Sequence, residues 1–112
     1  MKKENRLRKS KEFDRVYKHG KNYWNRQLTI YVYKNNTETT RIGYTITKKI
    51  GNAVTRNKVR RRMKEIVRLN FENIDSGYDI IFIPKKNVVD LPYDKLEKSM
   101  IHVMTVGKIY KR

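Results

Sequence analysis

The sequence predicts an α+β domain in which helices pack against a small mixed β-sheet. Some segments alternate apolar and polar residues, as strands do, and others repeat apolar residues every three or four positions, as helices do. They follow one another as a helix, two or three strands, a long helix, one strand and a final helix. With 112 residues, 38% of them apolar, residues 1–112 are expected to form a single two-layer domain with its helices on one face of the sheet.

The first element is a short helix expected over residues 11–19. Ser10 is a favourable N-cap residue, and Gly20 is typical of the position that ends a helix. Apolar and aromatic residues at helical spacing form one stripe: Phe13, Val16 and Tyr17. A single stripe of this kind is typical of a helix with one packed face.

Strands are expected next. Residues 27–34 and 41–48 alternate between two faces. The polar run over residues 34–40, KNNTETT, predicts a hairpin loop that joins them. Residues 21–24 are interpreted as a short edge strand.

The second half of the chain predicts a long helix from Ala53 to Asn70. Its buried stripe is expected to be Val59, Met63, Ile66 and Val67. Residues 79–83 contain four consecutive apolar residues, which predict a strand covered on both faces. A final helix is expected from Leu91 to Val106, and the tail, residues 107–112, is expected to fray.

The charge of the chain points to an anionic partner. There are 28 Lys and Arg residues against 11 Asp and Glu residues, a net charge of +17. Residues 1–26 carry +7 and residues 41–68 carry +9, so two segments hold almost all of the excess. These segments form one continuous basic face if the fold brings them together.

Several other classes of protein are disfavoured. The chain has no cysteine, which fits a reducing cytoplasm and excludes disulfides and thiolate metal sites. Residues 1–13 lack the apolar core of a secretory signal, and no apolar run approaches the length of a membrane span. No helix shows a spare apolar face beside its charges, so a membrane surface is not the expected partner.

The most basic element is the long helix. Seven of the thirteen residues Arg56–Arg68 are Lys or Arg, and only Glu65 is acidic. Arg60, Arg61, Lys64 and Arg68 form a row beside the apolar stripe. A charged row is usually just a solvated face, but acidic partners one turn away are nearly lacking here. The planar guanidinium group of arginine is suited to binding phosphate oxygens. The free backbone N–H groups at the start of this helix, after Gly51, are a second candidate phosphate site, and the alternative is a plain strand-to-helix turn.

Aromatic residues offer a second candidate surface. Phe13 and Tyr17 lie on the first helix, and Tyr31 and Tyr33 share one face of a strand. Rings that line a groove beside basic residues stack on single-stranded bases. The alternative is that these rings fill the core.

Catalytic groups are not evident. The closest acidic pairs are Asp75 with Asp79 and Asp90 with Asp94, in the weakly charged part of the chain, and His19 and His102 are isolated. Metal-dependent or histidine-dependent cleavage needs paired carboxylates or a His with a partner. We therefore expect no catalytic residue and no metal site in this chain.

Three segments together resemble the protein subunit of bacterial ribonuclease P. They are residues 6–20 (RLRKSKEFDRVYKHG), residues 25–27 (NRQ) and residues 46–65 (ITKKIGNAVTRNKVRRRMKE). The most specific part, KKIGNAVTRNKVRR, resembles the family's RNR motif, and the likeness extends through DIIFIPKK and the last helix. In that family a catalytic RNA removes the 5′ leader of precursor tRNA, with Mg²⁺ bound mainly by the RNA. The implied fold is αβββαβα with a left-handed βαβ crossover.

The resemblance also implies two sites. Contact with the RNase P RNA is carried over to Lys48, Lys49, Asn52, Ala53, Arg56, Asn57, Lys58, Arg60, Arg61, Lys64 and Arg68. Contact with the leader is carried over to Phe13, Tyr17 and Tyr31. The expected partners are thus the RNA subunit and precursor tRNA, with neither DNA nor membrane, and the expected location is cytoplasmic.

The sequence departs from the family pattern at several positions. Lys58 stands where the motif has its second arginine, and Tyr23-Trp24 is bulkier than the usual pair, which the resemblance does not explain. A ribosome-associated or general RNA-chaperone protein shares the charge, and a stand-alone nuclease is a further alternative. A DNA-binding helix-turn-helix is disfavoured because a strand replaces the helix expected before the basic helix.

Overall fold

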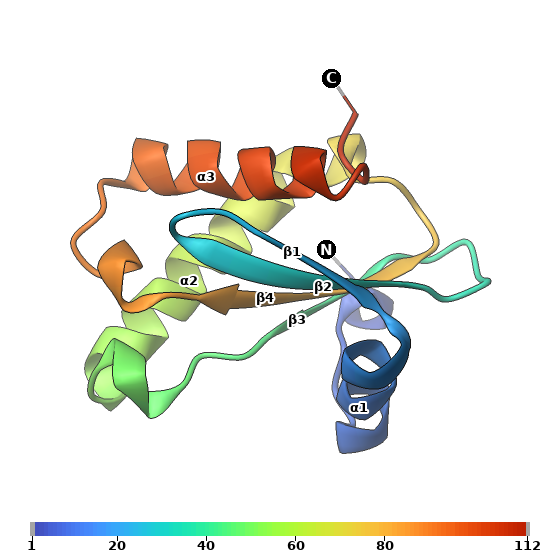
Figure 1. Cartoon of the computed structure of the whole chain (residues 1–112), viewed down its shortest axis with the longest axis horizontal. Coiled ribbons are helices and arrows are strands. Elements are labelled where there is room, and N and C mark those ends of the chain that lie inside the picture. The colour runs from blue at the N-terminus through green and yellow to red at the C-terminus, as the bar shows by residue number, and fades with distance from the viewer. Residues whose placement is uncertain (1, 112) are drawn as a thin grey trace.

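The computed structural model describes residues 2–111. Its element order is αβββαβα, as expected (Figure 1). The elements are α1 (Ser10–His19), β1 (Lys21–Trp24), β2 (Leu28–Lys34), β3 (Arg41–Tyr44), α2 (Ala53–Asn70), β4 (Tyr78–Pro84) and α3 (Tyr93–Val106).

The four strands form one mixed sheet in the order β1-β2-β4-β3. β4 is antiparallel to β2 and parallel to β3, so α2 makes a crossover between two parallel strands. The left hand of this crossover stays a prediction. The expected hairpin between residues 27–34 and 41–48 is wrong, because β4 lies between these strands. Four consecutive residues of β4 are buried, and a strand so covered takes the centre of a sheet.

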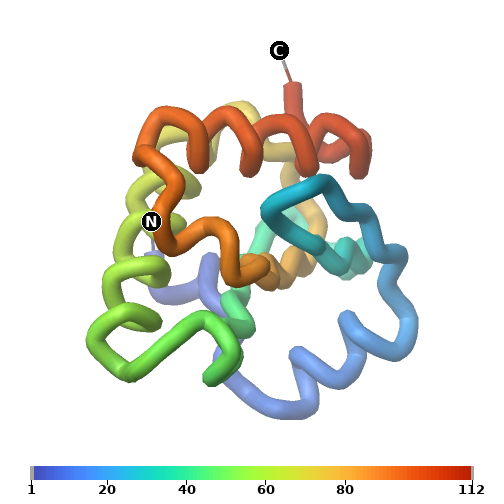
Figure 2. The backbone as a smooth tube through the Cα atoms, turned by 60° about the vertical axis from the view of Figure 1, so that its left-hand side comes forward, coloured from blue at the N-terminus to red at the C-terminus, as the bar shows by residue number. Residues whose placement is uncertain are grey.

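Helices cover both faces of the sheet, α2 and α3 on one and α1 on the other (Figures 1 and 2). The expectation of helices on one face alone holds for α2 and α3 and fails for α1. The reason lies in the alternation of β2 and β4. Ile30 and Phe82 face the main core under α2 and α3, whereas Tyr31 and Ile81 face a second cluster under α1. Both strand faces therefore need a helix.

The start of α1 is fixed by Glu12 and not by the expected N-cap residue. Its carboxylate accepts hydrogen bonds from the backbone N–H groups of Arg8, at 2.9 Å, and Lys9, at 3.0 Å. The helix accordingly begins at Ser10, one residue earlier than expected. It ends before Gly20, where a Cβ atom would lie 2.5 Å from the carbonyl oxygen of Val16. That close approach requires glycine.

The third strand is shorter than expected and ends at Tyr44. A 3₁₀ turn, Lys48–Ile50, then leads to Gly51, whose φ of 149° favours glycine. Asn52 is the N-cap of α2, and its side chain accepts a hydrogen bond from the N–H of Thr55 at 2.9 Å. The buried stripe of α2 is confirmed: Val59, Met63, Ile66 and Val67.

The C-terminal tail is ordered by packing, so the expected fraying is wrong for residues 107–111. The side chain of Ile109 is 1% exposed, and Tyr110 forms a β-bridge with Ile74. The N–H of Lys111 donates to the carbonyl oxygen of Asn73 at 2.7 Å. Burial of Ile109 and these backbone contacts together hold the polar tail. Arg112 lies outside the described residues.

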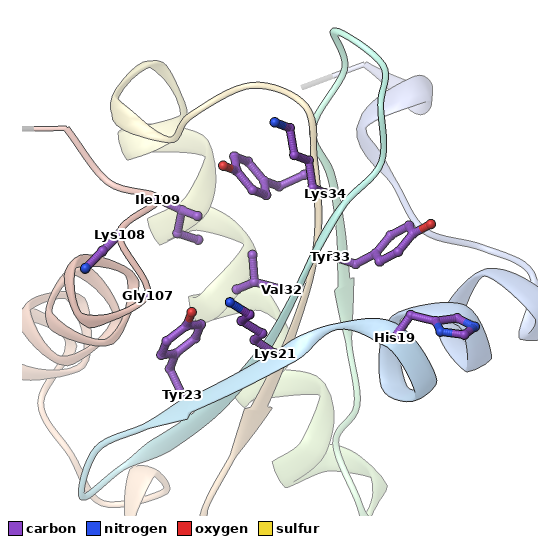
Figure 3. Close-up of a pocket in the computed structure, with 10 residues that line it drawn as sticks. His19, Lys21, Tyr23, Val32, Tyr33, Lys34, Gly107, Lys108 and Ile109 are labelled. Carbon is purple, nitrogen blue, oxygen red and sulfur yellow. The ribbon is translucent and has the colours of Figure 1, made fainter.

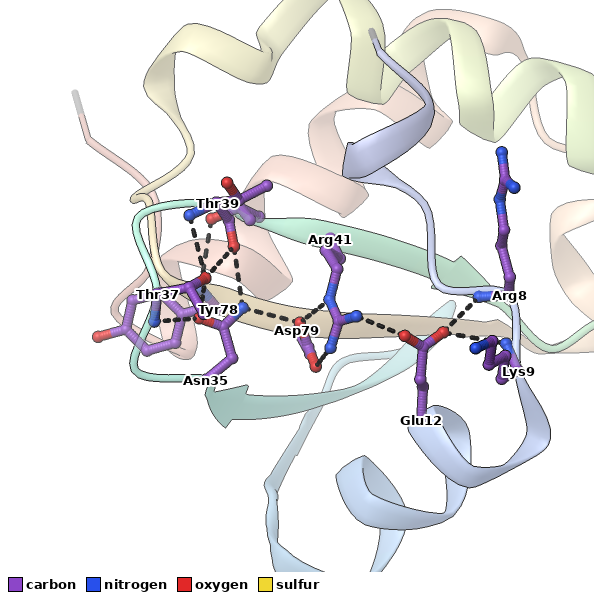
Figure 4. Close-up of polar contacts among 10 residues, drawn as sticks. Arg8, Lys9, Glu12, Asn35, Thr37, Thr39, Arg41, Tyr78 and Asp79 are labelled. Atoms are coloured by element: carbon purple, nitrogen blue, oxygen red, sulfur yellow. Dashed lines mark hydrogen bonds and ion pairs between the residues drawn. The ribbon is translucent and has the colours of Figure 1, made fainter.

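A charged network ties α1 to the sheet (Figure 4). The carboxylate of Asp79 is 0% exposed and accepts from Arg41 through Nε, at 2.9 Å, and Nη2, at 2.7 Å. Nη1 of Arg41 donates to Glu12, and Asn35 donates to Asp79 at 2.8 Å. Arg41 thus links β3 to the adjacent strand β4 and to the first turn of α1.

Glu12 is expected to make stability depend on pH. Backbone hydrogen bonds from Lys9 and Arg8, and then the charge of Arg41, hold the pKa of Glu12 below its ordinary value of 4.5. A lowered folded-state pKa stabilises the fold above the unfolded-state pKa, and this contribution is lost as pH falls through the folded-state value. Glu12→Gln should therefore be less stable than the native chain at neutral pH, with a difference that shrinks below pH 4.5. Urea unfolding at several pH values measures it, and a difference that stays constant contradicts this role.

Candidate nucleic-acid interface

The predicted RNA-subunit contacts lie on the surface of α2 and of the turn before it. Most of these side chains are exposed, and Arg56 and Arg60 are half-buried. Some already have partners within the chain. Arg56 donates to the carbonyl oxygen of Gly51 at 2.7 Å and so holds the turn, and Arg68 pairs with Glu65. The cations of this surface are therefore not equally available to a polyanion.

The two flanks of α2 differ in what their cations contact. On one flank, Arg62 donates to the carbonyl oxygen of Leu91 and joins α2 to the segment before α3. On the other flank, Lys64 lies near Arg6 and Arg60. Partial burial, and then the charges of Arg6 and Arg60, lower the pKa of Lys64. Mutually repelling cations of this kind favour a bound anion.

Basic residues of the N-terminal segment and of α2 line one pocket with a volume of about 440 Å³. Its cations are Arg6, Arg8, Arg60 and Lys64, and in the described part of the chain no acidic side chain lines it. We call these four residues and their pocket the basic notch. The expectation that the two basic segments meet on one face is thus confirmed at this point.

The backbone of the N-terminal segment positions the notch. Residue Leu7 donates its N–H to the carbonyl oxygen of Ile42 at 3.0 Å, and Arg6 forms a parallel bridge with Ile42. Residues 6–8 therefore run beside β3. Successive side chains of an extended segment point to opposite sides, so Leu7 enters the second core cluster while Arg6 and Arg8 reach the notch.

Tyr44 forms part of the notch wall. Its ring stacks on Phe82 with a centroid distance of 5.9 Å and an interplanar angle of 20°. Burial raises the pKa of its hydroxyl, and among residues 2–111 this oxygen is the one buried side-chain polar atom without a hydrogen-bond partner. An unpaired buried hydroxyl carries a desolvation cost.

The three predicted leader-contacting rings are brought together between α1 and the sheet. Tyr17 and Tyr31 meet edge to face, with ring centroids 4.9 Å apart and an interplanar angle of 78°. The hydroxyl of Tyr17 lies 2.6 Å from Oγ1 of Thr45. The Phe13 ring lies so close to Gly43 that a Cβ atom there would be 2.7 Å from it. All three rings pack on the second core cluster and stay partly exposed, so they combine core filling with an accessible face.

A second basic pocket, of about 390 Å³, lies near the C-terminus of α3 (Figure 3). Its lining includes Lys21, Lys34 and Lys108. Tyr23 forms one wall, and a Cβ atom on Gly107 would lie 3.2 Å from its ring. This packing explains the bulk at position 23.

Among residues 2–111, no three His, Cys, Asp or Glu side chains are grouped so that they could hold a metal ion. In the same part of the chain, no helix has the length and apolar character needed to cross a membrane.

The family of this chain follows from comparing its sequence with models of known protein families. The profile described as Ribonuclease P matches residues 1–107. The chain belongs to the Ribonuclease P protein family.

Individual Ribonuclease P proteins show the same likeness over nearly their whole length. The ribonuclease P protein component of Finegoldia magna is 52% identical over 98 residues, which cover 88% of this chain and 86% of the relative. That of Clostridium botulinum is 43% identical over 109 residues, which cover 96% and 98%. The structure of the Staphylococcus aureus RNase P protein superimposes with a TM-score of 0.88 at 32% identity, covering 96% of this chain and 98% of that one.

Within this Ribonuclease P fold, sequence reasoning missed three candidate residues: Arg6, Arg8 and Tyr44. The high positive charge of residues 1–26 indicated that this segment contributes to the basic face, but it did not show which of its ten cationic residues lie near α2. Tyr44 gave no signal, because one tyrosine in a strand is ordinary.

Proposed function

We propose that this chain is the protein subunit of ribonuclease P, the ribonucleoprotein endoribonuclease that removes the 5′ leader from precursor tRNA. The RNA subunit carries the catalysis, and this chain binds the RNA subunit and the leader. The observation that carries the proposal is the basic notch in a chain of this family. It joins α2 to the rings under α1, since Phe13 lines the notch together with Arg60 and Lys64.

The surface proposed for the RNA subunit is α2 with its preceding turn. The residues assigned to it are Lys48, Lys49, Asn52, Ala53, Arg56, Asn57, Lys58, Arg60, Arg61, Lys64 and Arg68. Their cations replace counterions along the RNA backbone, which gives strong and salt-dependent affinity. Arg56 donates a hydrogen bond to the carbonyl oxygen of Gly51, so its main contribution is to hold the turn in place and not to bind phosphate directly.

The surface proposed for the leader is the aromatic face of Phe13, Tyr17 and Tyr31. Each exposed ring stacks on a base with about 1–3 kcal/mol, regardless of base identity. Leaders differ in sequence from one tRNA to another, so sequence-tolerant stacking suits this substrate. Arg6 and Arg8, the two notch cations that precede α1, hold phosphates of the same strand.

Magnesium ions are assigned to the RNA subunit, as the resemblance implies. This chain helps by neutralising phosphates and holding the leader, which strengthens substrate and Mg²⁺ binding by the complex. The site of action is proposed to be the cytoplasm, where precursor tRNA is made in bacteria.

The leader surface predicts a selective loss in Tyr31→Ala. In the complex reconstituted with a bacterial RNase P RNA, this variant should bind precursor tRNA about fivefold or more weakly, because one stacking ring is lost. Binding of mature tRNA, which has no leader, should be unchanged. Tyr31→Phe keeps the ring and is the matched control. Equal losses for both tRNAs, or equal affinity of the native complex for both, would favour a general RNA-binding role.

A further inference from the structure

Trp24 is a large aromatic side chain for which the core has no use. It is 62% exposed and is the single tryptophan of the sequence. Isolated exposed apolar residues are ordinary in proteins, so exposure alone carries no conclusion. The inference rests instead on the face of the sheet where this ring lies and on the contacts that hold its backbone.

The strand register places Trp24 on the same face of the sheet as the proposed leader surface. Neighbouring residues of a strand face opposite sides, and Tyr23 packs on the main core under α3. Trp24 therefore faces the side of α1. It pairs with Thr29, which lies two residues before Tyr31 on the same face of β2. Diagonal neighbours of this kind have Cα atoms about 7–8 Å apart.

The backbone next to Trp24 is held firmly. The Asn25 side chain accepts from the N–H groups of Gln27 and Leu28, at 3.0 and 2.9 Å. It also donates to the backbone oxygen of Ser99, at 2.9 Å, and to its hydroxyl, at 3.0 Å, in α3. An exposed ring on a fixed backbone loses little freedom when a ligand binds.

Cations lie at the turn that follows Trp24. The Lys85 ammonium group lies 2.7 Å from the carbonyl oxygen of Asn25, the residue after Trp24. Arg26 follows in the same turn, and both cationic residues are exposed. An aromatic ring followed by cations within two residues suits a single strand, in which bases alternate with phosphates.

We propose that Trp24 is a stacking platform for one further nucleotide of the 5′ leader, beyond the base that stacks at Tyr31. The inference rests on the proposed leader surface and extends it across β2 to the edge strand β1. It also gives a role to Trp24, the residue of the Tyr23-Trp24 pair that packing against α3 does not explain.

Because Trp24 is the single tryptophan, its fluorescence reports on this site alone. The test uses the complex with a bacterial RNase P RNA and a series of precursor tRNAs whose leaders are shortened one nucleotide at a time. Trp24 emission should change only with leaders long enough to reach β1. Trp24→Ala should lose about fivefold or more in affinity for those leaders and nothing for shorter ones. Trp24→Phe should retain most of the affinity.

The controls separate this inference from the proposed function. Val106→Ala removes an exposed apolar side chain from α3 and should leave the affinity for every leader unchanged. If Tyr31→Ala is impaired while Trp24→Ala binds every leader normally, the platform is wrong and the leader surface stands. If neither variant changes the dependence on leader length, the leader surface itself is wrong. Emission that changes with the RNA subunit alone, or with protein concentration, assigns the ring to another occupant and overturns the inference.

Discussion

The affinity of this chain for a bacterial RNase P RNA is expected to fall by about 10³-fold or more between about 50 and about 200 mM salt. This follows if α2 and its preceding turn neutralise roughly six to ten phosphates of that RNA, because each neutralised phosphate releases condensed counterions. Titrations of the labelled RNA at several salt concentrations give the slope. A flat response would exclude α2 as a phosphate-binding surface.

Paired variants locate that surface. Arg60→Ala combined with Arg61→Ala should lower the salt slope by about two, since each lost phosphate contact removes about one unit. Lys95→Ala combined with Lys98→Ala removes the same charge from exposed positions of α3 and should leave the slope unchanged. If the two double variants behave alike, only net charge matters and the assignment to α2 fails.

Arg41→Ala is expected to lower the free energy of unfolding by about 3–5 kcal/mol, a large part of the roughly 5–15 kcal/mol typical of a domain. The variant leaves the fully buried Asp79 carboxylate without its cation. Asn35 still donates to it but does not neutralise it. Urea unfolding of the native chain and the variant measures the difference.

A matched control for Arg41 is Arg68, which also pairs with a carboxylate. The pair of Arg68 with Glu65 is exposed to solvent, with about half of each side chain accessible. Arg68→Ala should therefore leave stability unchanged within error, because exposed ion pairs contribute little. Equal losses in the two variants would show that burial of Asp79 is not what makes the network important.

The elements predicted best from the sequence were those whose signal is local. The apolar stripe of α2 and the apolar run of β4, in which Ile80, Ile81 and Phe82 are fully buried, are signals contained within single segments. The order of the strands in the sheet depends on contacts between segments far apart in the sequence. Alternation in residues 41–48 says that a strand forms but not which strand it pairs with, and β4 arrives only after α2. Arg41 and Asp79 are register partners across that strand pair, and neither segment alone shows their contact.

The candidate site shows the same division. The cations of α2 were predictable because they are dense within one helix. Arg6 and Arg8 join them only because Leu7 pairs with Ile42 in β3, a contact that the charge pattern does not contain. The partial burial of the three rings also depended on α1 packing alone on its face of the sheet.

The most direct test of the two-surface account is leader removal by the reconstituted complex at low Mg²⁺. The native chain should stimulate cleavage of precursor tRNA by the RNA subunit. Arg60→Ala with Arg61→Ala should lose the stimulation for all substrates, whereas Tyr31→Ala should lose it only through weaker binding of leader-bearing substrates. A native chain that gives no stimulation, or that cleaves precursor tRNA at the mature 5′ end without RNA, would contradict the account.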